Sequence, residues 1–317
     1  MKFIDESRMK ELLSMEEAIE AVAEGMKIYS SGQCQAPLRT KIDAGGRGTI
    51  LFMPAYTDKI CMAGIKVVSV FPGNVSLGKP PVPATMLLIS GGTGEVVCAM
   101  DGTYLTKLRT GAVQGLATKL LSREDSQVAL IIGCGSQAPY QVQALLAVKS
   151  LEKLYLHDID MAKAQSLAGE VKRLYPGLEV SAVEDPKTVM KECDIVIAVT
   201  TSKKPVISGH LLKEGAFVCS IGSFTPDMQE VDEEAVKRAG KVFVDTKEGT
   251  MNEAGDVINP IRLGIIDREN VIELGRVLLG EVPGREDERQ IIVFKSVGLS
   301  IFDLMTAYRI YEKEQKG

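Results

Sequence analysis

The sequence predicts an α/β protein with a doubly wound parallel sheet in one domain and a second, α+β domain. Two observations lead to this fold class. From residue 122 to residue 298, short apolar segments rich in branched residues alternate with segments of helical periodicity, the pattern of a parallel sheet with helices on its faces. Before residue 121, extended segments follow one another through a glycine-rich turn, which is typical of an antiparallel or mixed sheet.

The composition is that of a globular protein and excludes several functional classes. The 317 residues are 45% hydrophobic and 25% charged, with a formal net charge of −5. This balance favours neither a nucleic acid nor an acidic membrane surface as partner. The first ten residues lack the apolar core of a secretory signal. Six cysteines lie far apart and only two histidines occur, so we expect reduced thiols, a cytoplasmic location and no metal site.

The first domain opens with a helix and continues with extended segments. Ser14 and Glu17 form a capping box at the start of the helix, and Gly32 closes it. Extended segments are predicted at 48–56, 61–71 and 84–102. The last of them is a hairpin with Gly91 and Gly92 in its turn. An apolar-periodic helix at 103–122 leads into the second domain.

The stretch 128–149 carries no charge until its last residue and allows three interpretations: a membrane span, a buried core helix, or a strand and a helix joined by a turn. Two glycines, a proline and three glutamines argue against the membrane span. Residues 127–133 read instead as a strand buried on both faces, and residues 136–149 read as a helix with Pro139 in its first turn.

The same alternation continues to the end of the second domain. Strands are predicted at 178–183, 194–200, 215–223, 241–246 and 291–298, and helices at 161–176, 185–193 and 232–240. A final helix at 299–315 places Ile301, Leu304, Met305 and Tyr308 on one apolar stripe, and we assign it to the first domain. The predicted domains are therefore 1–121 with 299–317, and 122–298.

The turn within 128–149 reads Gly133-Cys134-Gly135-Ser136-Gln137-Ala138, a G-x-G-x-x-A motif. The first glycine permits a tight turn, the second lets a pyrophosphate approach the backbone, and the alanine lets helix and strand pack closely. The N-terminus of the helix offers free N–H groups to phosphates. Asp158 ends the next strand, where an acid binds a ribose 2′-hydroxyl and repels a 2′-phosphate. The pattern predicts a Rossmann-type domain that binds NAD, with NADP as the alternative.

Three basic residues of the first domain are candidates for binding an anion. Lys66 interrupts an otherwise uncharged apolar strand, where a cation is costly unless it meets a protein carboxylate or an anionic ligand. Arg39 and Arg109 supply groups that clamp a carboxylate bidentately. The three together suit a small carboxylic acid, while a solvated surface position is the alternative for each arginine.

The chain resembles the ornithine cyclodeaminase/mu-crystallin family in seven segments that follow in the family's order: APLRTKI, IKVVSVFPGN, PATMLLISGGTGEVVCAMDGTYLTKLRTGA, IGCGSQA, LHDID, IGSFTPDMQEVD and FKSVGLSIFDLMTA. Members of this family include ornithine and lysine cyclodeaminases, alanine dehydrogenases, and reductases of ketimines or Δ1-pyrroline-2-carboxylate. The resemblance implies a homodimer in which a Rossmann domain accompanies a substrate and dimerisation domain built from both ends of the chain.

Carried over position by position, the resemblance implies the roles of individual residues. Lys66 would handle a proton and would bind the substrate carboxylate together with Arg39 and Arg109, and Thr85 would line the substrate pocket. The implied cofactor positions are Thr110, Gly133, Gly135, Ser136, Gln137, Asp158, Gly222 and Gly298, the segments around the last two flanking the nicotinamide.

One position departs from the family's pattern. The cyclodeaminases carry a catalytic aspartate two residues before the proline of the loop that here reads GSFTPDMQE, and Phe224 stands in that place. A phenylalanine cannot handle the substrate amine, which weighs against ornithine cyclodeaminase, but it suits an apolar ring. We therefore expect an imino-acid substrate, with NAD(P)H-dependent reduction of Δ1-pyrroline-2-carboxylate to proline as the activity. Ornithine cyclodeamination, alanine dehydrogenation and a non-catalytic, crystallin-like binding role are the alternatives.

Overall fold

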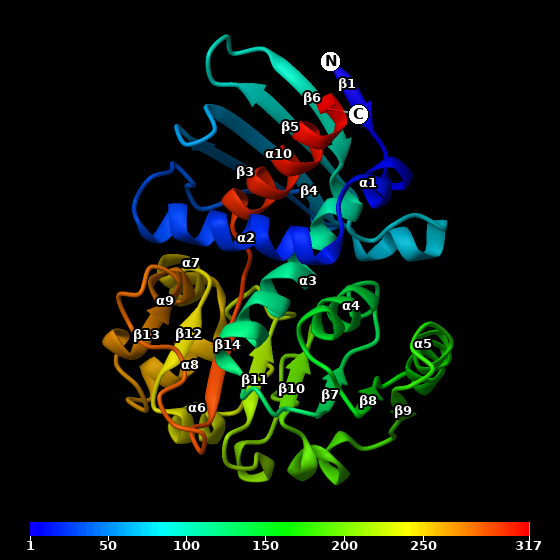
Figure 1. Ribbon diagram of the computed structural model, residues 1–317, viewed down its shortest axis with the longest axis vertical. Coiled ribbons are helices and arrows are strands. Elements are labelled where there is room, and N and C mark those ends of the chain that lie inside the picture. Colours follow the sequence, from blue (N-terminus) through cyan, green and yellow to red (C-terminus); the bar gives the residue numbers. More distant parts are fainter. Residues whose placement is uncertain (317) are drawn as a thin grey trace. The chain divides into compact units, whose positions relative to one another are not determined.

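The computed structural model describes residues 1–316 (Figure 1), which form two compact units. Unit 1 comprises Met1–Ala112 and the chain from Gly298 onward, and unit 2 comprises Val113–Val297. Helix α3, Gly102–Leu121, is continuous across the first division. From sequence the division is expected at the end of this helix, because a helix carries no boundary signal in its interior.

Unit 1 is built on a six-stranded mixed sheet with the order β1-β6-β5-β4-β3-β2. Its strands are β1 (Lys2–Ile4), β2 (Thr40–Asp43), β3 (Thr49–Thr57), β4 (Met62–Val70), β5 (Ala84–Ser90) and β6 (Val96–Asp101). The β1–β6 pair is parallel and the others are antiparallel. The helices of this unit are α1 (Glu6–Leu12), α2 (Met15–Ser30), the first part of α3, and α10 (Ser300–Lys316), with a 3₁₀ turn at Pro72–Leu77.

Helix α10 packs on β3, β4 and β5 and against α2 (Figure 1). The capping box predicted from Ser14 and Glu17 is present at the start of α2, and Gly32 beyond its end has the left-handed φ of +69°. Along β4 alternate residues are buried, from Met62 through Lys66 to Val68. Lys66 therefore lies on the buried face of its strand, although it is charged.

Unit 2 is built on an eight-stranded sheet, parallel throughout, with the order β13-β12-β14-β11-β10-β7-β8-β9. Its strands are β7 (Val128–Ile132), β8 (Lys153–His157), β9 (Glu179–Ala182), β10 (Ile195–Ala198), β11 (Phe217–Ser220), β12 (Val242–Val244), β13 (Val271–Glu273) and β14 (Ile292–Lys295). From β7 the chain runs outward to β9 and then returns to β10 on the other side of β7. The order reverses there, and ligands of such sheets bind at the carboxyl ends of the strands beside this point.

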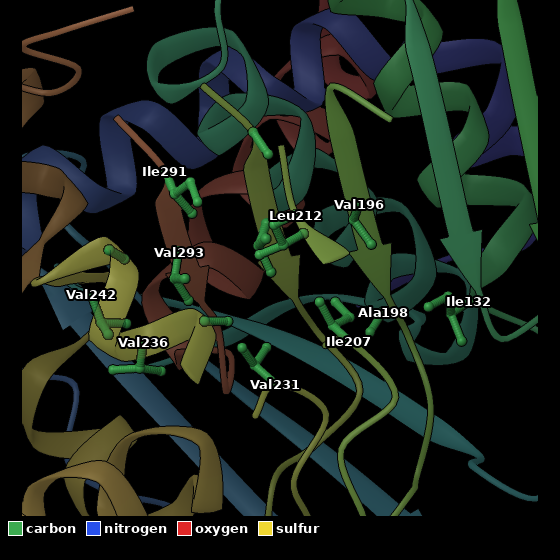
Figure 2. Close-up of a cluster of buried hydrophobic side chains, with 14 of the residues drawn as sticks. Ile132, Val196, Ala198, Ile207, Leu212, Val231, Val236, Val242, Ile291 and Val293 are labelled. Atoms are coloured by element: carbon green, nitrogen blue, oxygen red, sulfur yellow. The ribbon is translucent and has the colours of Figure 1, made fainter. Parts of the chain in front are cut away.

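Helices and an apolar core complete unit 2. Its helices are α4 (Ala138–Val148), α5 (Met161–Leu174), α6 (Glu233–Ala239), α7 (Lys247–Glu253), α8 (Gly255–Arg262) and α9 (Leu274–Leu278). Figure 2 shows a cluster of buried side chains that includes Val196, Val236, Val242 and Val293. The predicted fold class, a doubly wound parallel sheet with a second α+β domain, is confirmed.

Several short elements differ from the prediction. The helix expected at 185–193 is instead two 3₁₀ turns, Pro186–Thr188 and Met190–Glu192, separated by Val189. Each is only three residues long, and the β-branched Thr188 and Val189 disfavour a continuous helix there. The elements β1, α1, β2, α7, α8, β13 and α9 were not predicted. Among the described helices, none combines the length and apolarity that crossing a membrane requires.

Candidate active site

A buried ion cluster forms in unit 1 around Lys66. In the register of the sheet Lys66 pairs with Met53 on one side and Met86 on the other, and its side chain is 1% exposed. Its Nζ lies 2.8 Å from both carboxylate oxygens of Asp303, on α10. Of the two partners expected for this lysine, the structure shows the protein carboxylate.

Two arginines and a glycine adjoin this ion pair. Arg109, on α3, is buried and donates from Nε to Asp303 Oδ1 over 2.9 Å. Arg39 precedes β2 and donates from Nη2 to the carbonyl of Gly298 over 3.1 Å. Gly298 has φ +80°, and a Cβ at this position would lie 2.6 Å from Nη1 of Arg109. Glycine is therefore required here by the backbone conformation and by the guanidinium packed against it.

The cluster contains three cationic side chains, Lys66, Arg39 and Arg109, and one carboxylate, Asp303, and together with burial they set the pKa of Lys66. Burial lowers the pKa of Lys66 from its ordinary 10.5 to about 7, with Arg109 and Arg39 acting in the same direction, while Asp303 opposes them. A lysine with this pKa gains and loses its proton near neutral pH. The cluster can therefore bind a small anion, and Lys66 can both contribute to that binding and donate a proton to the bound molecule.

The glycine-rich motif lies in unit 2, between the carboxyl end of β7 and the start of α4. Gly133 has φ +99°, and a Cβ there would meet the carbonyl oxygen of Val199 at 2.7 Å, so only glycine fits. At Gly135 a Cβ would have no neighbouring atom within 4 Å, so the space beside this part of the backbone is open. Ser136 is exposed, and Gln137 precedes the helix as its N-cap residue.

Two further observations test whether this loop fits a dinucleotide. Asp158, which follows β8, accepts the backbone N–H of Cys134 over 2.7 Å and that of Asp160 over 2.9 Å, so its carboxylate lies beside the loop. Within the described chain, buried amide atoms of Gln137 and Gln141, at the start of α4, have no hydrogen-bond partner. The open space, the carboxylate and these polar atoms fit a bound pyrophosphate and ribose.

A second loop of unit 2 follows β11 and carries Gly222 and Phe224. The backbone N–H of Gly222 donates to the carboxylate of Glu230 over 2.8 Å, and a Cβ on this glycine would clash with the Thr200 carbonyl oxygen. The Glu230 carboxylate also accepts the N–H of Thr200, in the loop that follows β10. One buried carboxylate thus joins the loops that leave β10 and β11. Phe224 is half-buried on the second of them.

A buried lysine reinforces the same loop. Lys295, at the end of β14, donates to Ser220 Oγ over 3.0 Å and to Ser223 Oγ over 2.6 Å. Its Nζ lies 3.5 Å from Asp256 Oδ2, and Asp256 accepts a hydrogen bond from Ser223. The residues on either side of Gly222 are therefore fixed by buried polar contacts.

The structure separates the predicted residues into three groups. Arg39, Lys66, Arg109 and Gly298 lie together in unit 1, and Thr110 follows Arg109 on α3. The glycine-rich loop with Asp158 and the loop with Gly222 and Phe224 belong to unit 2. Thr85 does not join the first group, because it pairs with Val67 and so projects from the opposite face of the sheet to Lys66.

Asp303 belongs to the cluster but was not predicted from the sequence. It lies in the run SIFDLMTA, a single charge among buried apolar residues, which is the same signal that identified Lys66. The apolar stripe predicted for the final helix contains residues on either side of Asp303 but not Asp303 itself. In the part of the chain that the structure describes, no cluster of His, Cys, Asp and Glu has the arrangement of a metal site.

The chain matches one known protein family and is similar to several characterised proteins. The model of the ornithine cyclodeaminase/mu-crystallin family matches residues 2–317. A Δ1-pyrroline-2-carboxylate reductase of Bacillus cereus is 35% identical over 316 residues, 99% of this chain and 96% of that protein. The structure of Thermococcus litoralis Δ1-pyrroline-2-carboxylate reductase with NADH and L-proline has 39% identity and a TM-score of 0.94, covering 100% of this chain and 98% of that one. An archaeal alanine dehydrogenase dimer with bound NAD has 33% identity and a TM-score of 0.91, covering 100% and 96%.

Proposed function

The chain belongs to the ornithine cyclodeaminase/mu-crystallin family, and we propose that it is an NAD(P)H-dependent reductase of cyclic imino acids, which converts Δ1-pyrroline-2-carboxylate to proline. The observation that carries the proposal is the buried cluster of Lys66, Arg109 and Arg39, in which an anion-binding site contains a lysine whose pKa is about 7. Relatives that carry this activity support it at 35% and 39% identity.

The reaction requires a hydride at the imine carbon, a proton at the imine nitrogen and a fixed carboxylate. When bound, NADH would supply the hydride and become NAD⁺. Lys66 donates the proton to the nitrogen. The C=N double bond becomes a C–N single bond, with one new C–H and one new N–H bond, and Lys66 is left neutral until solvent reprotonates it. Arg39 and Arg109 bind the carboxylate and orient the ring.

The residues of unit 2 serve the cofactor and the ring. Gly133 permits the tight turn, and Gly135 leaves the backbone open to the pyrophosphate. Asp158 would accept hydrogen bonds from the hydroxyls of the adenosine ribose, which favours NADH over NADPH. Phe224 offers an apolar wall to the methylene carbons of the ring. The polar contacts of Glu230 and Lys295 hold the loop that carries it.

Alanine dehydrogenation is the second candidate, because an archaeal alanine dehydrogenase is similar over the whole chain. That reaction needs a group that handles ammonia. Asp303 is not available for this, since both of its oxygens already accept hydrogen bonds from Lys66, and one of them also accepts a bond from Arg109. Phe224 cannot replace it, and the same argument weighs against ornithine cyclodeamination.

A spectrophotometric assay of NADH oxidation tests the proposal, with Δ1-pyrroline-2-carboxylate in one arm and pyruvate plus ammonia in the other. We expect turnover of the cyclic imine. Turnover of pyruvate and ammonia alone would make the protein an alanine-type dehydrogenase. If neither arm reacts and ornithine reduces NAD⁺ transiently or releases ammonia, the proposal is wrong and cyclodeamination replaces it.

A further inference from the structure

The carboxylate of Asp303 occupies the centre of the cluster in unit 1. Asp303 has no exposed surface and lies in an apolar turn of α10. Its Oδ1 accepts from Lys66 Nζ over 2.8 Å and from Arg109 Nε over 2.9 Å, and its Oδ2 accepts from Lys66 Nζ over 2.8 Å. A side chain from the last helix of the chain thereby links β4 to α3.

We propose that Asp303 is a positioning residue of the reaction: it fixes the Lys66 ammonium and the Arg109 guanidinium relative to each other and keeps Lys66 protonated as the acid. The inference rests on the proposed function, because it assigns Lys66 a proton to donate and Arg109 a carboxylate to bind. In this role Asp303 acts through Lys66 and Arg109, the two cations whose hydrogen bonds it accepts.

The direction of the hydrogen bonds supports a positioning role for Asp303. Asp303 accepts from Nε of Arg109, so it leaves the edge formed by the two Nη groups for the carboxylate of a ligand. Those Nη groups lie against Gly298, where a Cβ would meet them. With both oxygens of its carboxylate accepting hydrogen bonds from these two cations, Asp303 holds them in fixed positions relative to each other.

The charges around Lys66 explain why a counter-ion is needed. Arg109 faces it from α3, Arg39 from the segment before β2, and Asp303 from α10, while its neighbours in the sheet are the uncharged Met53 and Met86. Three cations with one carboxylate still attract a monoanion. Without that carboxylate, burial and the two arginines would remove the proton from Lys66 at a lower pH.

Binding of a ring carboxylate that has no imine nitrogen provides the test. The probe is 1-cyclopentene-1-carboxylate, titrated calorimetrically at a series of pH values into the NADH-loaded full chain and its variants. With the natural protein, we expect affinity to fall as pH rises through about 7, where Lys66 loses its charge. In Asp303→Asn the carboxamide keeps the size and loses the charge, so the midpoint should move down by about one pH unit or more.

Asp194→Asn is the matched control. Asp194 is also a buried carboxylate bound to an arginine and a lysine, Arg123 over 2.9 Å and Lys213 over 2.7 Å, but it lies just before β10 in unit 2. Its loss should lower the melting temperature and leave the pH midpoint where it is. An unmoved midpoint in Asp303→Asn would overturn the proposal, because a purely structural role lowers stability without shifting the titration of Lys66.

Asp303→Glu covers the case in which Asp303→Asn does not fold. The longer acid keeps the charge and displaces both cations, so we expect the natural midpoint with an affinity reduced about tenfold; unchanged affinity would contradict positioning. If the natural protein binds the probe with the expected pH dependence but does not reduce Δ1-pyrroline-2-carboxylate, the proposed function fails while the arrangement of Asp303 stands. No binding by the natural protein at any pH would overturn the role assigned to Asp303, and the NADH-oxidation assay would decide the proposed function separately.

Discussion

Lys66 lies where a lysine costs the folded chain free energy. Its pKa of about 7, against an ordinary 10.5, means that the folded state holds the proton less tightly than the unfolded state does. The penalty is absent above the unfolded pKa, grows as pH falls and is complete below about 7, where it is on the order of 5 kcal/mol. Shifted pKa values of this kind are concentrated at functional sites, which supports the role proposed for Lys66.

The pH dependence of the reduction follows from the same shift. As the proposed proton donor, Lys66 can act only in its charged form, which predominates below its pKa. We therefore expect kcat/KM for Δ1-pyrroline-2-carboxylate to fall about tenfold for each pH unit above about 7. Initial rates of NADH oxidation over a pH series check this, and a profile that stays flat to about pH 9 would rule out Lys66 as the acid.

Lys66→Met separates chemistry from cofactor binding. The apolar side chain has a similar length but no proton and no charge, so turnover should fall by about 10²–10⁴-fold. NADH affinity, measured by the fluorescence of the bound cofactor, should not change, because the glycine-rich loop belongs to unit 2. Lys41→Met, an exposed change on β2, serves as the control. Loss of both activity and NADH binding would show that Lys66 does not act on the substrate alone, contrary to its assignment.

Asp158 offers a test of the cofactor assignment. Its carboxylate lies beside the glycine-rich loop through the N–H of Cys134, where it would repel a 2′-phosphate. Replacing it with serine should raise the ratio of kcat/KM for NADPH to that for NADH by roughly tenfold. Asp160→Ser, two residues on, keeps a residue able to cap α5 and should leave the ratio unchanged. An unchanged ratio in Asp158→Ser as well would remove its assignment as the ribose acid.

At the scale of elements, the carboxyl ends of the strands in unit 2 are joined by Glu230. This buried carboxylate accepts backbone N–H groups from the loops that follow β10 and β11, and the second loop carries Phe224. Loop backbone otherwise tends to be mobile, since its polar groups have no ladder to pair with. A charged acceptor shared by two loops gives the predicted wall for the substrate ring a fixed position.

Glu230→Gln should loosen both loops. The amide retains one oxygen but loses the charge and presents N–H groups to backbone donors, so we expect unfolding free energy to fall by about 3 kcal/mol. KM for the cyclic imine should rise more than KM for NADH. Urea unfolding followed by circular dichroism gives the first quantity and steady-state kinetics the second. The control is Glu234→Gln in the first turn of α6, and equal effects of the two changes would contradict the role of Glu230.

Local signals made most elements of the fold predictable. Ser14 and Glu17 cap α2, and Gly240 closes α6, so both helices could be bounded from sequence. Strand β1 could not, because three residues carry no period and it forms by pairing with β6, far along the chain. The site shows the same limit. Lys66 stood out as a charge in an apolar strand, but its pairing with Asp303 depends on how α10 packs on β4, which no local pattern records.

At the scale of the whole molecule, α3 is the element that both units share. Arg109 lies in the part assigned to unit 1, and the residues from Val113 to Leu121 belong to unit 2. Helix formation is cooperative, so neither half of α3 is expected to melt without disturbing the other. The chain should therefore unfold as one cooperative unit rather than as two.

Calorimetry checks this expectation. In a thermal scan we expect a single transition, which NADH at about 100 times its dissociation constant should stabilise by about 2.7 kcal/mol. NADH should move the entire transition, although most of its predicted contacts lie in unit 2. Asp158→Ser, with weakened NADH binding, is the matched control. Two resolved transitions, only one of them displaced by NADH, would show that α3 does not couple the units.

The contact between Lys66 and Asp303 can form only late in translation. The two residues are 237 positions apart, so a ribosome adding about 5–20 residues per second produces the lysine roughly 10–50 s before its counter-ion. By then Val113–Val297 has been translated in full. The nascent chain can thus fold unit 2 while the proposed carboxylate site does not yet exist, and Lys66 gains its partner only when α10 leaves the ribosome.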